Sequence, residues 1–279
     1  MEMNRLLRQV VPALLLLLPE LLQAQLNVSP SATAIGGCSV LAEDYWSVLQ
    51  NPAGLAFTKE PVFAFAQQRN FLIKELDVQE VQFSSPVFKT SGAGFAYSRS
   101  GYSLYQEQDL SMVWSQRFGE KISGGIQCRY HALKLGEGYG SKSVLLFRAG
   151  IIAKLTPAFT VATQMENPLM EGIVSYQQER LPVLFSLGAS FKFSEQLKIL
   201  AEGRQEIGAE IIFCGGLEYR PVSGLVIRGG ISSVPLQGSF GFGWRWKKIA
   251  FTVSAARHPY LGFSPHLGIA VFLGKKSME

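Results

Sequence analysis

Apolar and polar residues alternate along most of the chain after residue 60. Between residues 126 and 132 every second residue is polar, and residues 183–193, 239–246 and 266–273 place apolar residues, mainly Phe, Trp, Leu, Ile and Val, at every second position. A period of two indicates β-strands whose two faces meet different surroundings. These segments are about as long as the 9–11 residues that a tilted membrane-spanning strand needs.

The alternating segments predict a sheet that closes on itself. An even number of strands is typical of single-chain barrels, and closure leaves no strand edge with unpaired backbone groups in lipid. We therefore predict an all-β fold, a transmembrane antiparallel β-barrel of about 14 strands. The predicted strands are centred near residues 64, 80, 95, 112, 127, 148, 161, 187, 199, 213, 228, 242, 253 and 269.

The lengths of the connections also favour a barrel of the bacterial outer membrane, in which outer loops are long and periplasmic turns are short. If the first strand runs outward, every longer connection falls on the outer side. The longer connections are predicted near residues 68–75, 99–108, 133–142, 166–180 and 257–265, and the shorter ones near 117–121, 155–158, 193–196 and 246–248.

Composition decides which face of the sheet points outward. Charged residues make up only 17% of the chain, mean hydropathy is +0.16, and glycine (28) and phenylalanine (19) are frequent. A soluble lipocalin-like barrel would turn its apolar face inward, and so few charges would leave it without a solvated exterior. We expect the bulky apolar face to meet outer-membrane lipid and the glycine-rich face to line a lumen. Aromatic residues near strand ends are candidates for interfacial girdles: Tyr97, Trp114, Tyr130, Tyr219, Trp244 and Trp246.

The first 24 residues are typical of a secretory signal peptide. Arg5 and Arg8 precede an apolar run from Val10 to Leu22, and Ala24 offers a cleavage site that leaves Gln25 at the new N-terminus. A transmembrane anchor is the alternative, which the short and broken apolar run disfavours. We thus divide the chain into a signal peptide (1–24), an N-terminal segment (25–58) and the barrel (59–279).

The charges and cysteines exclude several functions. A net charge of +5 without an extended cluster of Lys and Arg does not suggest a nucleic-acid partner. Cys38, Cys128 and Cys214 lack CxxC spacing, so we expect no metal or cofactor, and sequence alone does not choose a disulfide pair. Gly36-Gly37-Cys38 resembles a lipoprotein acylation box, but such a box directly follows the apolar run of the signal peptide, and here about a dozen residues intervene. We therefore favour the interpretation that Cys38 is a small residue buried in a tight turn.

Residues 25–58 differ from the rest and are predicted to form a compact hatch in the lumen. Ala42–Gln50 can form a short helix, with acidic residues in its first turn. Pro52 ends this helix and Gly54 permits a tight reversal. Fourteen strands enclose a lumen wider than their own side chains fill, which leaves room for such a segment.

This stretch resembles the start of the PorV/PorQ family, which is similar in fold to FadL outer-membrane barrels. The resemblance covers about thirty residues, in which a Gly-Gly turn and a short acidic-aromatic helix precede Asn-Pro-Ala-Gly. It implies a hatch-bearing barrel that works in type IX secretion and binds secreted proteins or their C-terminal signal domains. The matching residues here are Gly36, Gly37, Glu43, Asp44, Trp46, Asn51, Pro52, Ala53 and Gly54.

An enzyme is not expected. The three histidines, His131, His258 and His266, lack HExxH spacing, and no GxSxG elbow supports an outer-membrane lipid hydrolase. Charged residues on the inward face need partners, so we interpret them as a lumen network against the hatch. In this network Arg228 and Arg245 are expected to pair with Glu202, Glu210 or Glu218. The lumen candidates are Arg129, His131, Arg148, Glu202, Arg228 and Arg245.

Three functions are compatible with these patterns. The first is a component of type IX secretion that binds other secretion-system proteins or secreted substrates, and the second is a FadL-like channel for hydrophobic small molecules. The third is an outer-membrane enzyme. A channel should have a lateral opening or a kinked strand and a continuous apolar tunnel, whereas a binding component should have a plugged lumen and a contact surface at its loops or rim.

The first testable prediction concerns location. The mature protein should begin at Gln25, fractionate with the outer membrane and show heat-modifiable mobility in gels, because a closed barrel resists detergent until it is boiled. N-terminal sequencing and membrane fractionation measure both properties. Recovery of the protein in the soluble periplasm would contradict the prediction.

Overall fold

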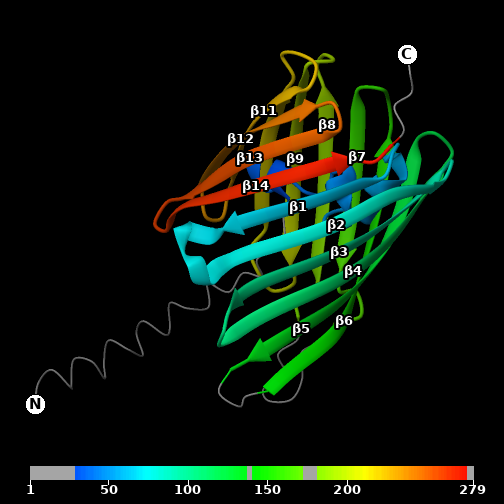
Figure 1. Ribbon diagram of the computed structural model, residues 1–279. Coiled ribbons are helices and arrows are strands. Elements are labelled where there is room, and N and C mark those ends of the chain that lie inside the picture. The colour runs from blue at the N-terminus through cyan, green and yellow to red at the C-terminus, as the bar shows by residue number, and fades with distance from the viewer. Residues whose placement is uncertain (1–28, 137–139, 172–180, 275–279) are drawn as a thin grey trace, which may run out of the picture.

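The protein is a closed barrel of fourteen antiparallel strands. The computed structural model describes residues 29–136, 140–171 and 181–274, so the predicted signal peptide lies outside the described residues. Each strand pairs with the next along the chain, and β1 pairs with β14 to close the ring (Figure 1). The strands are β1 Val62–Arg69, β2 Asp77–Phe88, β3 Ser91–Tyr102, β4 Tyr105–Phe118, β5 Ile122–Leu135, β6 Gly140–Lys154, β7 Phe159–Glu166, β8 Leu184–Lys192, β9 Leu197–Glu206, β10 Ile212–Tyr219, β11 Leu225–Ser232, β12 Gln237–Trp246, β13 Ile249–His258 and β14 Gly262–Phe272.

The two faces of the strands lie as their alternation predicts. In β1 the side chains of Phe63 and Phe65 are 45% and 39% exposed, whereas those of Val62 and Ala64 are buried. Large apolar side chains therefore cover the outside of the barrel, where lipid solvates them. The predicted fold class and the predicted location in the outer membrane are both confirmed by this closed, apolar-sided barrel. The six aromatic residues expected in girdles are all exposed on the outside: Tyr97, Trp114, Tyr130, Tyr219, Trp244 and Trp246.

Several outer connections are shorter than predicted. β3 and β4 meet at a turn of residues 103–104, and β13 and β14 are joined by residues 259–261, where longer loops were expected. β5 likewise runs on to Leu135 and β6 begins at Gly140. The polar residues that suggested loops extend these strands beyond the apolar band, because backbone pairing does not require apolar side chains. The connection at 70–76 is long and lies on the predicted side, and the described ends of the connection between β7 and β8 lie on that side too.

The described part of the N-terminal segment, residues 29–58, lies inside the barrel. It contains α2 (Pro30–Ala34) and the 3-10 helices η2 (Tyr45–Val48) and η3 (Pro52–Phe57), which Figure 1 shows in blue within the ring. We call residues 29–58 the hatch. Two further 3-10 turns, η4 (Asn70–Leu72) and η5 (Lys74–Leu76), lie in the first outer connection. No helix in the described ranges is long and apolar enough to cross a membrane.

The predicted helix Ala42–Gln50 is wrong in length. Only η2 forms there, because the side chain of Asp44 caps it by accepting a hydrogen bond from the Trp46 amide at 2.9 Å. Asn51 then caps η3, with Pro52 at its first position. Pro52 thus begins a second helix, for which its fixed φ is well suited, and does not merely end the first one.

Apolar packing between hatch and wall forms three clusters. In one of them Trp46 is buried against Val62, Ala64 and Ala270 of β1 and β14. In another, Val48 and Leu55 pack against β3 and β4. The third joins hatch residues to β6, β7, β9 and β10: Ile35, Cys38, Val40, Leu41 and Ala53 pack there with Ile152, Ala162, Leu200 and Cys214. The core of this protein is therefore the hatch surface, inside the ring.

The second prediction tests the face assignment. Phe242, in the middle of β12, is 49% exposed toward lipid. Phe242→Arg should lower the free energy of unfolding by about 2–4 kcal/mol, since a cation at the bilayer midplane is poorly solvated. Urea titration of the refolded barrel in lipid measures this loss.

The matched control lies one residue away. A Cβ at Gly241 would lie 2.8 Å from the Ala34 side chain, so Gly241→Arg should expel the hatch by steric conflict. Single cysteines labelled with a fluorophore and exposed to a lipid-soluble quencher distinguish the two faces. Quenching at positions 239, 241 and 243, in place of 240 and 242, would reverse the assignment.

Candidate functional site

Asn51 is the central polar residue of the hatch. It is fully buried, its Nδ2 donates to the Val40 carbonyl at 2.6 Å, and its Oδ1 accepts from the Ala53 amide at 3.1 Å. The Asn51 side chain also reaches β7, where its Nδ2 lies 3.5 Å from the Thr163 carbonyl. Backbone groups therefore satisfy the hydrogen-bonding capacity of the Asn51 side chain.

Glycines on the wall make this close approach sterically feasible. Gly150 of β6 lies directly against the Asn51 side chain, and Gly125 of β5 lies against Pro52. Any Cβ at these two positions would collide with the hatch. Within the hatch, Gly54 lies against the Ala42 carbonyl in the same way. The Asn-Pro-Ala-Gly segment thus fits a wall surface that has no side chains.

The Gly-Gly turn docks on the opposite wall. Gly36 and Gly37 adopt φ values of +74° and +85°, which favour glycine. The backbone of Ile35 and Gly36 rests on Gly216 and Gly230 of β10 and β11. The glycine-rich inner face that sequence analysis identified is therefore the docking surface of the hatch.

Arg148 of β6 holds the hatch by its backbone. Its Nη1 donates to the carbonyls of Leu49 and Gln50, both at 2.7 Å, and its Nε donates to Glu166 at 3.1 Å. Charge-assisted hydrogen bonds to otherwise unpaired carbonyls stabilise a segment that forms few regular hydrogen bonds of its own.

Glu202 of β9 plays the complementary role. Its Oε2 accepts from the amides of Ser39 and Val40 at 2.6 and 2.9 Å. Arg204 donates to the Oε1 of Glu202 at 3.0 Å and to the Gly37 carbonyl at 2.8 Å. Arg148 thus donates to carbonyls at residues 49–50 of the hatch, and Glu202 accepts from amides at residues 39–40.

Arg129 and His131 of β5 extend this polar network on the outer side of the hatch. His131 Nδ1 lies 2.8 Å from an Asp109 carboxylate oxygen, and Arg129 forms an ion pair with Glu166. Because Arg148 also pairs with Glu166, this network is continuous with the hatch contacts. All these groups have charged or hydrogen-bonding partners, as a structural network requires.

The two remaining lumen candidates lie at the end of the barrel where the turns are short. Arg228 pairs with Glu218 at 2.8 Å, which is one of the partners expected for it. Arg245 does not reach any of the expected glutamates. It pairs with Glu60 at 2.7 Å and stacks on the ring of Phe272. The pair with Glu60 was not predicted, because Glu60 lies just after the hatch and was not counted among the lumen residues. Glu210 is exposed in a turn and does not belong to the network.

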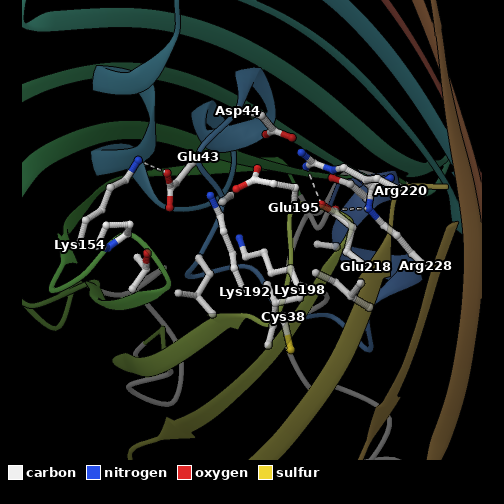
Figure 2. Close-up of a pocket in the computed structure, with 18 of the residues that line it drawn as sticks. Cys38, Glu43, Asp44, Lys154, Lys192, Glu195, Lys198, Glu218, Arg220 and Arg228 are labelled. Carbon is white, nitrogen blue, oxygen red and sulfur yellow. Dashed lines mark hydrogen bonds and ion pairs between the residues drawn. The ribbon is translucent and has the colours of Figure 1, made fainter. Parts of the chain in front are cut away.

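Three cavities open between the hatch and the wall at this same end. Their volumes are about 710, 810 and 580 Å³, and all three are lined by Glu43. Figure 2 shows the first of them, with Lys192 and Lys198 facing it from β8 and β9. Short turns mark the periplasmic side of an outer-membrane barrel. We call the three cavities together the periplasmic vestibule.

Asp44 lies at the floor of the vestibule. Burial raises the pKa of its carboxyl above the usual range, and the neighbouring Arg228 opposes this shift. The same burial raises the pKa of the Tyr45 hydroxyl. Both groups belong to the hatch, so the charge of the vestibule floor depends on how the hatch is docked.

One irregularity in the wall also lies beside the vestibule. The pairing of β2 with β3 shifts register between Pro86 and Phe88. Both residues line the 580 Å³ cavity with Phe57 of the hatch. Phe88 is 68% exposed and contacts Trp114, which faces outward, at 6.4 Å between ring centroids. Sequence reasoning missed this bulge, for which Pro86 within a strand was the available signal.

The fold and the docked hatch define an outer-membrane β-barrel with an internal N-terminal plug. No protein-family model matches this chain, and no curated protein matches it either. Its likeness to known proteins is one of structure.

Several solved outer-membrane barrels are similar to this chain in structure. The toluene transporter TodX of Pseudomonas putida superposes with a TM-score of 0.60 at 12% identity, over 87% of this chain and 96% of TodX. A Pseudomonas aeruginosa FadL homologue gives 0.60 at 11% identity, over 88% and 98% of the two chains. Omp33 of Acinetobacter baumannii gives 0.52 at 7% identity, over 77% and 98%. These similarities establish a FadL-like fold.

The third prediction tests the docking of the hatch. Asn51→Leu preserves volume but leaves the Val40 carbonyl without its donor, which should destabilise the docked hatch by about 1–3 kcal/mol. Cleavage of residues 29–58 by proteinase K in the folded barrel should become measurably faster, while membrane insertion persists.

Asn70→Leu is the matched control, because Asn70 is another buried amide and lies in the first outer connection. It should leave hatch protection unchanged. A wild-type hatch that proteinase K cleaves freely would show that the docked plug does not exist in solution.

Proposed function

We propose that this barrel passes small hydrophobic molecules across the outer membrane. The observation that carries the proposal is the bulge at Pro86–Phe88, where the wall is irregular beside a 580 Å³ cavity. Phe88 lines that cavity and also contacts an outward-facing ring. Cavities of about 300–1,000 Å³ suit ligands of drug size. The proposed route leads from the membrane past Phe88 into the periplasmic vestibule.

The fold supports the same proposal. A solved neighbour is described as a toluene transporter and, in a variant, as a monoaromatic hydrocarbon channel. A plugged barrel suits such cargo, because an apolar molecule can move between hatch and wall without a continuous aqueous pore. Water-soluble solutes, in contrast, need an open lumen, which the hatch occupies.

Two lysines of the vestibule support amphipathic cargo, and the same cavity is also lined by the carboxylates of Glu43, Glu195 and Glu218. Lys192 and Lys198 are directly opposed across β8 and β9, and both line the 710 Å³ cavity. Like charges opposite each other destabilise a strand pair, so an anionic group between them would be favoured. We therefore extend the proposal to molecules that combine an apolar body with a carboxylate.

The fourth prediction is a transport measurement. Cells that lack other FadL-like barrels and express this chain should take up radiolabelled toluene or a long-chain fatty acid faster than cells with an empty vector. Phe88→Ala should increase the rate several-fold, because it removes the side chain between cavity and lipid. Phe240→Ala removes another outward-facing phenylalanine, 60% exposed on β12, and is the matched control that should have no effect.

Nitrocefin, a hydrophilic probe, should enter at the vector rate in all these strains. Uptake of both apolar probes at the vector rate, from a barrel shown to be folded by heat-modifiable mobility, would contradict transport. Equal uptake by the Phe88 and Phe240 variants would contradict the lateral route.

A second candidate function is the binding of secreted proteins or their C-terminal signal domains in type IX secretion. The observation that favours it is the motif of Gly36, Gly37 and Asn51–Gly54, which resembles the PorV/PorQ family and docks the hatch firmly. A purification from detergent-solubilised outer membranes, followed by mass spectrometry, distinguishes the two functions. Stoichiometric co-purification of secretion-system proteins would favour this candidate, and recovery of the barrel alone would favour transport.

A further inference from the structure

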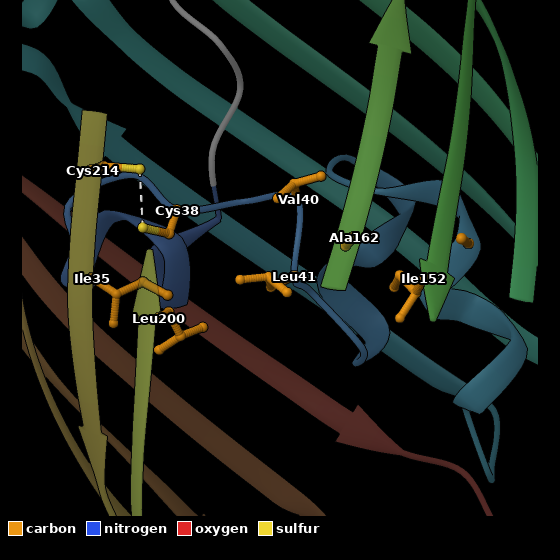
Figure 3. Packing of buried hydrophobic residues seen from close by; sticks show 9 residues of the cluster. Ile35, Cys38, Val40, Leu41, Ile152, Ala162, Leu200 and Cys214 are labelled. Atoms are coloured by element: carbon orange, nitrogen blue, oxygen red, sulfur yellow. Dashed lines mark hydrogen bonds between the residues drawn. The ribbon is translucent and has the colours of Figure 1, made fainter. Parts of the chain in front are cut away.

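Two cysteines meet at the boundary between the hatch and the wall. Cys38 follows the Gly-Gly turn of the hatch and Cys214 lies on β10, and their Sγ atoms are 3.0 Å apart (Figure 3). The two residues are 176 positions apart in the chain. Both are buried, with 3% and 7% of their surfaces exposed.

The contact is held from both sides. Arg204 donates to the Gly37 carbonyl, and Glu202 accepts from the Ser39 amide, so the residues that flank Cys38 are both fixed to β9. Ile35 and Leu200 enclose the two sulfur atoms in an apolar cluster (Figure 3). The two thiols therefore have one another as their nearest polar neighbours in a rigid setting.

A metal ion is the alternative occupant, because Glu202 brings a third ligand atom within 4.8 Å of both sulfur atoms. The carboxylate of Glu202 already accepts hydrogen bonds from two backbone amides and from Arg204. Among the described residues no fourth ligand joins this group. A tetrahedral metal site would need four donors and would lie beside the Arg204 cation, so the geometry favours a direct bond between the sulfur atoms.

We propose that Cys38 and Cys214 form a disulfide in the mature protein and tether the hatch covalently to the barrel wall. The two thiols lose two protons and two electrons, and the new S–S bond replaces both S–H bonds. One cysteine attacks the disulfide of a thiol oxidase of the periplasm and forms a mixed disulfide with it. The other cysteine then attacks this bond and releases the oxidase as a dithiol, which carries away the two electrons and the two protons. Cys128, on the outer face of β5, remains a free thiol.

The bond forms during assembly, before the hatch is fully enclosed. Once the hatch is docked, neither sulfur atom is accessible to an oxidant or a reductant. The nearby Cys214 and burial also raise the pKa of the Cys38 thiol, so the docked thiol hardly ionises. The same shielding protects the finished disulfide from reduction. The hatch can then shift around residue 38 but cannot leave the barrel.

Thiol counting on the full mature chain tests the proposal, and this is the fifth prediction. Outer membranes are quenched with acid, denatured and treated with maleimide-polyethylene glycol, before and after reduction. One adduct is expected without reduction and three after it. Cys128→Ser, the matched control, should give none without reduction. A non-reducing peptide map should join the peptides that contain residues 38 and 214.

Cys38→Ser and Cys214→Ser should each show two reactive thiols without reduction. If either variant fails to fold, the wild-type count and peptide map still decide. Three adducts without reduction would overturn the proposal, as would a map that joins Cys128 to either partner. Detection of one zinc ion per chain in the wild type and none in Cys38→Ser would overturn the disulfide in favour of a metal site.

Discussion

The close approach of the hatch backbone to the barrel wall is the contact on which this structure depends. A ring of fourteen strands encloses more space than its inward side chains fill. Here the wall carries glycine at several positions that meet the hatch, so the peptide groups between residues 35 and 36 and between residues 52 and 53 lie directly on the strands. This geometry turns an open lumen into a packed interior, and the three cavities of the vestibule open at the periplasmic end.

Such a hatch has a backbone problem that the wall solves. Its one short α-helix and two 3-10 helices leave many carbonyls and amides without regular partners. Arg148 supplies donors to two carbonyls, Glu202 supplies an acceptor for two amides, and Asn51 bridges hatch segments. Charged residues in the lumen therefore act first as substitutes for secondary structure.

The barrel could be predicted because one simple pattern, the alternation of outward-facing and inward-facing residues, recurs along fourteen strands. Alternation fixes which side chain meets lipid, so Phe242 and Arg148 could each be assigned a face from sequence. Most interaction partners of the lumen residues could not be predicted, because they depend on the path of the hatch through the lumen. Glu60, Ser39 and Cys214 acquire their neighbours only when that path is known. The helix Pro30–Ala34 was missed because five residues carry too little periodicity, although Ser29 and Pro30 form a standard helix start.

The seam between β1 and β14 sets the order in which the molecule is built. β1 begins within a few residues of the hatch, and its partner strand is the last one in the described chain. Until that seam closes, β1 has a free edge and the hatch is uncovered on the side where Trp46 packs. The hatch packs against strands on several sides of the ring, so the completed seam encloses it. Closure is therefore also encapsulation, and a chain that failed to join its two ends would lose its interior together with its wall.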